Sequence, residues 1–269
     1  MPPEPIFDPE NAGRTMRVAA FMSGSGTNIR KLLERQRRLE KEEGISPFEV
    51  IFIFSDRSDG RCAGEEIALE HGIPYFSYDI RAFHMINSIK RSVGTKEGLE
   101  ARKRYDRVAE TLLSAFEIDI IALGGYMSYI TLPRCVNVHP ADLSLTTPDG
   151  KRKYTGDNAV YDAIVAGEKS IRASTLWTDE GVDTGPLLMV SEPLKVDLPE
   201  PLERLVSDRD SLIDLVDGHQ EELKSIGDWI IFPLTIEMIA RGRFALDKDN
   251  SLYVDGKKVE AGYRPAPEK

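Results

Sequence analysis

Two polar side chains suited to acyl chemistry stand two residues apart, Asn137 and His139, in a short apolar run that stops at Pro140. Residues two apart in an extended segment point to the same side, so this spacing predicts that both side chains face one pocket. An amide can donate to a developing oxyanion, and an imidazole can move protons near neutral pH. On this motif alone, a core histidine bonded to a carbonyl is the competing interpretation.

A second candidate is the acidic segment at residues 178–186 (TDEGVDTGP), which lies between two apolar runs. One of its three carboxylates could orient His139 and hold the protonated form of that histidine. The acids could instead bind a hard cation, but their spacing does not follow that of a calcium loop. A solvated turn is the third interpretation.

Two glycine-rich segments complete the set of candidate sites. Residues 23–28 (SGSGTN) combine small side chains with a following helix, which predicts backbone N–H groups that approach a phosphate, or else a plain tight turn. The segment lacks the Lys of a Walker A loop, and Ile29 stands where the dinucleotide fingerprint has its third glycine. Residues 124–127 (GGYM) leave room for a ligand, and their apolar side chains could line a flat-ring pocket.

These motifs follow short apolar runs that alternate with helix-like segments. Such runs at residues 17–22, 49–54, 119–123 and 135–139 predict a mainly parallel sheet with helices on both faces, a Rossmann-like α/β fold. In such sheets, ligands bind beyond the carboxyl ends of the strands, where the candidate loops lie. The C-terminal part predicts helices over residues 200–242 and then a β-hairpin turned at residues 249–250.

The predicted domain organisation is simple. Residues 1–15 lack an apolar pattern and predict a disordered tail, residues 16–264 a single domain, and residues 265–269 a C-terminal tail. No internal repeat or linker divides the chain.

Together, the motifs resemble the folate-dependent formyltransferase family. The segments SGSGTN, DIIALGGYM, NVHP and DEGVDTGPLL occur in the family's order and at about its spacings, and IIFPLTIEMIARGRFAL is similar to the last helix of one of its subfamilies. The resemblance covers most of residues 16–264. It implies a formyltransferase that moves a formyl group from 10-formyltetrahydrofolate to a primary amine, that of glycinamide ribonucleotide in purine biosynthesis, without a metal.

The resemblance also implies roles for individual residues. Asn137, His139 and Asp183 would be catalytic, with Asn137 and protonated His139 stabilising the oxyanion while Asp183 orients the imidazole. By the same resemblance, the substrate phosphate is bound by Gly26, Thr27 and Asn28, and the ribose by Asp228. The folate is bound by Gly125, Tyr126, Met127 and Val182.

The chain departs from the family pattern at three places. HPADLS replaces the usual HPSLLP, TGDNAV replaces a histidine-rich segment, and the stretch at 129–136 is shorter than usual. The acceptor therefore stays open: another amine, water (a formyltetrahydrofolate deformylase), or no turnover at all in a folate- or nucleotide-binding module. A dinucleotide oxidoreductase, with Asp56 as ribose ligand, is the rival suggested by the fold class.

The composition of the chain narrows the classes of molecule that the protein is expected to bind. The 269 residues carry a formal net charge of −10, the wrong sign for broad nucleic-acid binding, and small-molecule substrates are expected. Two widely spaced cysteines suggest neither a disulfide framework nor a zinc site, which fits a cytoplasmic location. No apolar stretch has the length of a membrane span. A homodimer is compatible with the sequence.

Overall fold

The structure is a computed structural model that describes residues 2–266, and their contacts group into two compact units. The N-terminal unit holds residues 7–136, and the C-terminal unit holds residues 2–6 and 137–266. We expected one domain over residues 16–264. Of the expected C-terminal tail, residues 267–269 lie outside the described residues.

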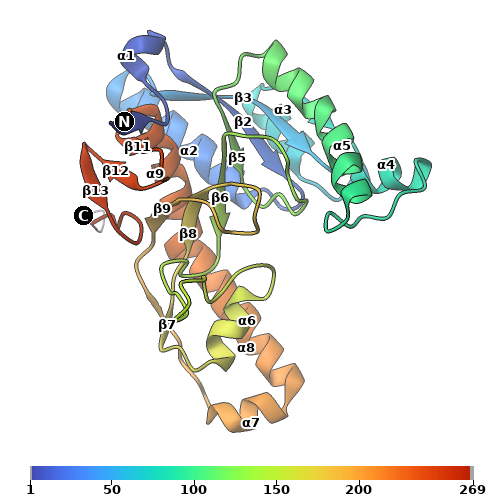
Figure 1. Ribbon diagram of the computed structural model, residues 1–269, viewed down its shortest axis with the longest axis vertical. Helices are drawn as coiled ribbons and strands as arrows, with labels where there is room; N and C mark the ends of the chain where they lie inside the picture. The colour runs from blue at the N-terminus through green and yellow to red at the C-terminus, as the bar shows by residue number, and fades with distance from the viewer. Residues whose placement is uncertain (1, 267–269) are drawn as a thin grey trace. The chain divides into compact units, whose positions relative to one another are not determined.

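The N-terminal unit is built on parallel strands in the order β4-β3-β2-β5. Its elements are α1 (Pro9–Ala12), β2 (Met16–Met22), α2 (Thr27–Glu43), β3 (Phe48–Ser55), α3 (Gly64–His71), β4 (Tyr75–Ser77), α4 (Ile80–Ile86), α5 (Lys96–Ala115) and β5 (Ile120–Leu123). Helices alternate with the strands along the chain (Figure 1). The predicted α/β fold with a mainly parallel sheet is confirmed.

Burial explains why these strands are apolar throughout. Every residue of β2 except Arg17 is buried, as a strand covered on both faces requires. Helix α2 buries Ile29, Leu32, Leu33 and Leu39, the face predicted from their spacing. The sheet therefore holds its loops on a rigid core.

The C-terminal unit begins inside strand β6 (Cys135–His139), the first two residues of which belong to the other unit. After β6 come α6 (Ala159–Val165), β7 (Ser170–Ile171), β8 (Ser174–Trp177), β9 (Leu187–Val190), β10 (Leu194–Lys195), α7 (Leu202–Ser207), α8 (Arg209–Leu223), the π-helical turn η1 (Lys224–Asp228), α9 (Trp229–Ala240), β11 (Phe244–Leu246), β12 (Leu252–Val254) and β13 (Lys257–Val259). Strands β8 and β9 pair antiparallel and carry the acidic loop between them.

The C-terminal helices and hairpin are confirmed. Strands β11 and β12 pair antiparallel around the predicted turn, where Asn250 has a left-handed φ of 60°. Between α8 and α9, the turn η1 packs so closely that a Cβ on Gly227 would lie 2.9 Å from the Cβ of Ala173. Glycine at this position lets the helix approach the start of β8.

The predicted disordered tail is wrong for residues that the structure describes. Strand β1 (Glu4–Pro5) pairs antiparallel with β11, and the Asp8 carboxylate caps α1 by accepting from the N–H groups of Glu10 and Asn11. The segment is ordered by pairing with β11, and the paired residues lie 240 and 242 positions apart in the sequence. Composition alone cannot predict a contact over such a distance.

Candidate active site

Strand β6 positions the first two candidate residues. Asn137 is half-buried, and His139 is 7% exposed two residues further along the same strand. Because side chains alternate along a strand, both point to the same side of β6. The structure therefore holds an amide and an imidazole side by side on a rigid element.

The acidic loop brings Asp183 to His139. The carboxylate oxygen Oδ2 of Asp183 lies 3.6 Å from His139 Nε2 and accepts a hydrogen bond of 2.8 Å from the backbone N–H of Gly156. Asp183 has a left-handed φ of 53°, a conformation that costs a non-glycine residue on the order of 1 kcal/mol. The loop thus bends sharply at the residue whose carboxylate faces the imidazole.

The fold of the loop itself explains why the other two acids stay away from His139. Asp179 closes a turn inside the loop, where its Oδ1 accepts from Gly181 N at 2.9 Å and from Thr184 Oγ1 at 2.6 Å. Glu180 is exposed. A Cβ on Gly185 would lie 1.9 Å from the carbonyl oxygen of Trp177, so glycine is required there.

Burial sets the protonation state of His139. Desolvation lowers the pKa of His139 below its usual value near 6.5, although the Asp183 carboxylate and a hydrogen bond with the Tyr154 backbone raise it. Nε2 has no hydrogen-bond partner among the described residues. Burial therefore favours the neutral imidazole over the protonated form that we expected Asp183 to hold. A neutral, unbonded Nε2 is free to accept a proton.

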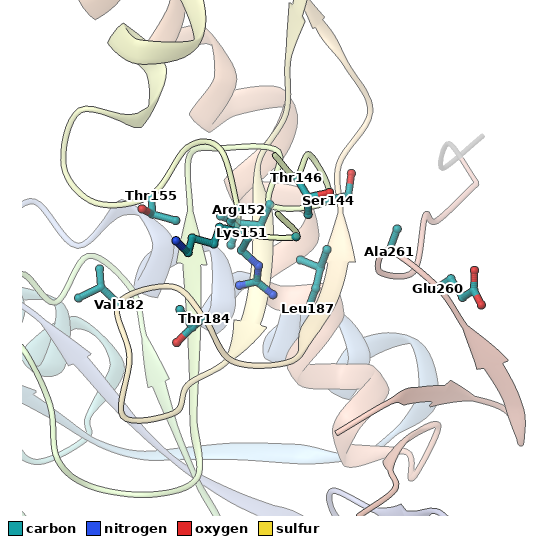
Figure 2. A pocket seen from close by; sticks show the side chains of 12 residues that line it. Ser144, Thr146, Lys151, Arg152, Thr155, Val182, Thr184, Leu187, Glu260 and Ala261 are labelled. Carbon is teal, nitrogen blue, oxygen red and sulfur yellow. The ribbon is translucent and has the colours of Figure 1, made fainter. Parts of the chain in front are cut away.

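An open cavity of about 870 Å³ borders the loop of Asp183 within the C-terminal unit (Figure 2). Its lining includes the neighbours of Asp183 on either side, Val182 and Thr184, together with Arg152, Thr155 and Glu260. The space is large enough for part of an organic substrate, although Asn137, His139 and Asp183 are not among the residues that line it.

In the N-terminal unit, the glycine segment forms the turn into α2. Gly26 caps that helix with a left-handed φ of 71°, and a Cβ there would lie 2.5 Å from atoms of both Met22 and Ile67. Ser25 Oγ and Thr27 Oγ1 lie 3.3 Å apart, and Asn28 Oδ1 is buried without a hydrogen-bond partner among the described residues. This is a helix N-terminus of the kind that receives anions.

The predicted folate residues divide by environment. Gly125 has a left-handed φ of 82° and accepts from Ser23 N, while Met127 is 71% exposed. Tyr126 is a core residue: its ring packs on Phe21, and its hydroxyl accepts from Arg102 Nη2 at 3.1 Å. In the C-terminal unit, Val182 is 59% exposed. Met127 and Val182 thus offer apolar surface, whereas the ring of Tyr126 is occupied by structural contacts.

The candidate ribose residue, Asp228, ends the π-helical turn η1 and is buried. Such turns inside helices are frequent at functional sites. Binding of the substrate ribose by Asp228 stays a prediction.

Sequence reasoning missed two groups that act on Asp183. Gly156 supplies the backbone N–H described above, and Arg152 donates to the backbone carbonyls of Asp183 and Gly185. Arg152 lies in a basic run (KRK) that predicts only a solvated surface, so no signal in the sequence could have identified it.

The sequence pattern of the formyl transferase family matches residues 16–207. The chain belongs to the formyl transferase family. Among curated members, it is 24% identical over 256 residues to phosphoribosylglycinamide formyltransferase from Haemophilus influenzae, which covers 92% of this chain and 98% of that protein. It is 28% identical over 237 residues to the trifunctional purine biosynthetic protein adenosine-3 of Drosophila melanogaster, covering 85% of this chain but only 14% of the fly protein.

Solved structures of formyl transferases share the fold. The phosphoribosylglycinamide formyltransferase from Coxiella burnetii superposes with a TM-score of 0.65 at 21% identity, covering 93% of this chain and 99% of that one. Within residues 2–266, this formyl transferase has no group of three or more His, Cys, Asp and Glu side chains that could hold a metal ion. In the same part of the chain, no helix is both long and apolar enough to cross a membrane.

Proposed function

We propose that this formyl transferase moves a formyl group from 10-formyltetrahydrofolate to the primary amine of glycinamide ribonucleotide, a step of purine biosynthesis. The observation that carries the proposal is the placement of three side chains in a chain that matches the family. Asn137 and His139 lie on one strand, and the carboxylate of Asp183 lies 3.6 Å from the His139 imidazole. The names of the related proteins support glycinamide ribonucleotide as the acceptor.

The proposed chemistry follows from the protonation state of the site. The amine nitrogen attacks the formyl carbon, a C–N bond forms, and the carbonyl electrons move to the oxygen, where the Asn137 amide donates a hydrogen bond. Neutral His139 takes the proton that the attacking nitrogen loses, and Asp183 stabilises the resulting imidazolium. When the intermediate collapses, the bond between the formyl carbon and N10 breaks, and that proton passes to N10.

The remaining site residues complete the proposal. Gly26, Thr27 and Asn28 would hold the substrate phosphate at the N-terminus of α2, and Asp228 would bind the ribose hydroxyls. Gly125, Met127 and Val182, with Tyr126 behind them, would contact the folate. Formyl transfer between two organic substrates calls for no metal. The small-molecule substrates and the two cysteines, which form no disulfide among the described residues, are consistent with a cytoplasmic location.

The test is a direct assay of the purified protein. We expect 10-formyltetrahydrofolate and glycinamide ribonucleotide together to release tetrahydrofolate and N-formylated product in equal amounts. An incubation without amine measures hydrolysis, and a panel of other phosphorylated or sugar amines measures acceptor choice. Release without amine would identify a deformylase, and product only from another amine would replace the proposed acceptor. No release under any of these conditions would refute formyl transfer.

A further inference from the structure

Arg152 joins the two loops that meet at Asp183. Its Nη1 donates to the carbonyl oxygen of Asp183, and its Nη2 donates to the carbonyl oxygen of Gly185 at 2.7 Å. Figure 2 shows the guanidinium directed toward the loop that carries Thr184. A planar guanidinium can hold two carbonyls at a fixed separation, which a single ammonium group cannot do. The two hydrogen bonds thus hold the carbonyl groups of the residues on either side of Thr184.

The backbone of Arg152 is itself held in place. Arg152 forms an antiparallel bridge with Thr146, and Lys153 N donates to the carbonyl oxygen of Leu145 at 3.0 Å. Next to them, the hydroxyl of Tyr154 donates to Glu168 at 2.7 Å. The guanidinium therefore extends from a small hairpin that is anchored at its base, so it can resist movement of the acidic loop.

Asp183 needs such a restraint. Its left-handed backbone is unfavourable for a residue with a side chain, and its carboxylate accepts from the backbone N–H of Gly156 besides its approach to His139. Without Arg152, the loop could relax to an ordinary conformation and carry the carboxylate away from the imidazole.

We propose that Arg152 is a positioning residue that holds the carboxylate of Asp183 at the imidazole of His139. The role rests on the proposed function, because it matters for turnover only if this pair performs the proton transfer. Arg152 acts through Asp183 and is not itself a catalytic residue.

The pKa of His139 provides a second effect that can be measured. The groups that act on His139 are the carboxylates of Asp183 and Asp157 and the backbone of Tyr154, which raise its pKa, and the guanidinium of Arg152, which lowers it together with burial. In R152K the positive charge stays, but loss of the two bonds to the loop lets the Asp183 carboxylate leave the imidazole, which lowers the pKa of His139. A purely structural residue elsewhere in the loop would not produce this shift.

The experiment compares R152A and R152K with the control K169A. Lys169 is an exposed cation of the same unit that does not line the cavity of Figure 2. In R152A, we expect formyl transfer to fall on the order of 10²-fold in kcat, since a displacement of about 1 Å has that cost. Added guanidinium should restore part of the loss. R152K should keep the charge but lose the two bonds to the loop carbonyls, so its kcat falls and the part of its pH profile that reports His139 moves to lower pH.

A titration followed by NMR gives a readout that does not depend on activity. The chain has four histidines, and the signal of His139 is assigned by its absence in H139Q. We expect the pKa of His139 to fall in R152K, where the carboxylate is displaced and the positive charge is kept, and to stay unchanged in the control variant. If R152A does not fold by circular dichroism, R152K and its kcat carry the test.

The outcomes separate the two proposals. A wild-type protein without any formyl transfer refutes the proposed function, and the NMR titration still decides whether Arg152 acts on the pair. An active wild type with R152K indistinguishable from the control variant, in kcat and in the pKa of His139, overturns the role of Arg152.

Discussion

The two units each bury a pair of ionisable side chains, but they complete the two pairs differently. On α5 of the N-terminal unit, Arg102 and Asp106 are each 2% exposed and lie 2.8 Å apart. Asp106 also accepts from the backbone N–H and the hydroxyl of Thr131, and Arg102 also donates to Tyr126. The two side chains are thus joined directly and bonded to their neighbours within the unit, although Arg102 Nη1 has no hydrogen-bond partner among the described residues.

The pair in the C-terminal unit is less complete. His139 and Asp183 stay 3.6 Å apart, and the imidazole nitrogen that faces the carboxylate has no hydrogen bond in the described structure. A buried polar group without a partner costs free energy, so such groups are retained mainly where they do chemistry. The contrast teaches that burial of charge does not by itself indicate a reactive site. The two pairs differ in their separation: Arg102 and Asp106 are in direct contact at 2.8 Å, whereas His139 and Asp183 are left 3.6 Å apart.

The largest expected effect tests the structural pair. D106A leaves the Arg102 charge buried without its carboxylate, which should lower the free energy of unfolding by about 3–5 kcal/mol. The control is E100A on the same helix, because Glu100 pairs with Lys103 at the surface and should contribute less than about 1 kcal/mol. Urea denaturation measures both. Equal stability of the two variants would contradict the structural role of Asp106.

The next effect tests the reactive pair. We expect N137A and H139A each to lower kcat of formyl transfer by about 10²–10³-fold, because each removes a group that acts on the transition state. Their unfolding free energies should change far less than that of D106A, since His139 Nε2 has no hydrogen bond to lose. Steady-state kinetics and urea denaturation on the same samples give the comparison. A large loss of stability with unchanged kcat would reverse the two assignments.

A smaller effect concerns pH. Burial lowers the pKa of His139 in the folded state. At a pH between this lowered pKa and the pKa near 6.5 of the unfolded chain, only the unfolded chain binds the proton. This group therefore destabilises the fold as pH decreases through that window, by up to about 1.4 kcal/mol per pH unit, and has no effect above it. H139Q should lose less stability than the wild type between pH 7 and pH 5. Parallel curves would show that His139 titrates normally.

The smallest effect extends the comparison to the glycine segment. G26A puts a side chain at a left-handed position close to Met22 and Ile67, which should cost about 1 kcal/mol of stability and raise KM for the phosphorylated amine. G24A is the matched control, because its Cβ would meet nothing within 4 Å. Similar KM values for the two variants would remove the phosphate role of this turn.

The sequence predicts the parts of the molecule that depend on local pattern. Apolar runs and helical spacing predict the sheet, the buried face of α2 and the C-terminal hairpin, because each is determined by neighbours in the chain. The order of the motifs also predicts the family. The roles of Asn137, His139 and Asp183 stay predictions until kinetics test them.

What the sequence does not predict depends on long-range contact. The hydrogen bonds of Arg152 reach Asp183 and Gly185, which lie 31 and 33 positions later in the sequence. The hydroxyl of buried Tyr126 is bonded to Arg102, 24 positions earlier. Neither contact has a periodicity or a turn signal that marks it. The net effect of desolvation on His139 likewise follows only from packing in three dimensions.

Strand β1 has a practical consequence for handling the protein. It covers one side of β11, so the four-stranded sheet has the order β1-β11-β12-β13 and β11 is an inner strand. Deleting the first six residues would turn β11 into an edge strand with unpaired N–H and C=O groups, which favours self-association between molecules. An affinity tag is therefore better placed away from this end.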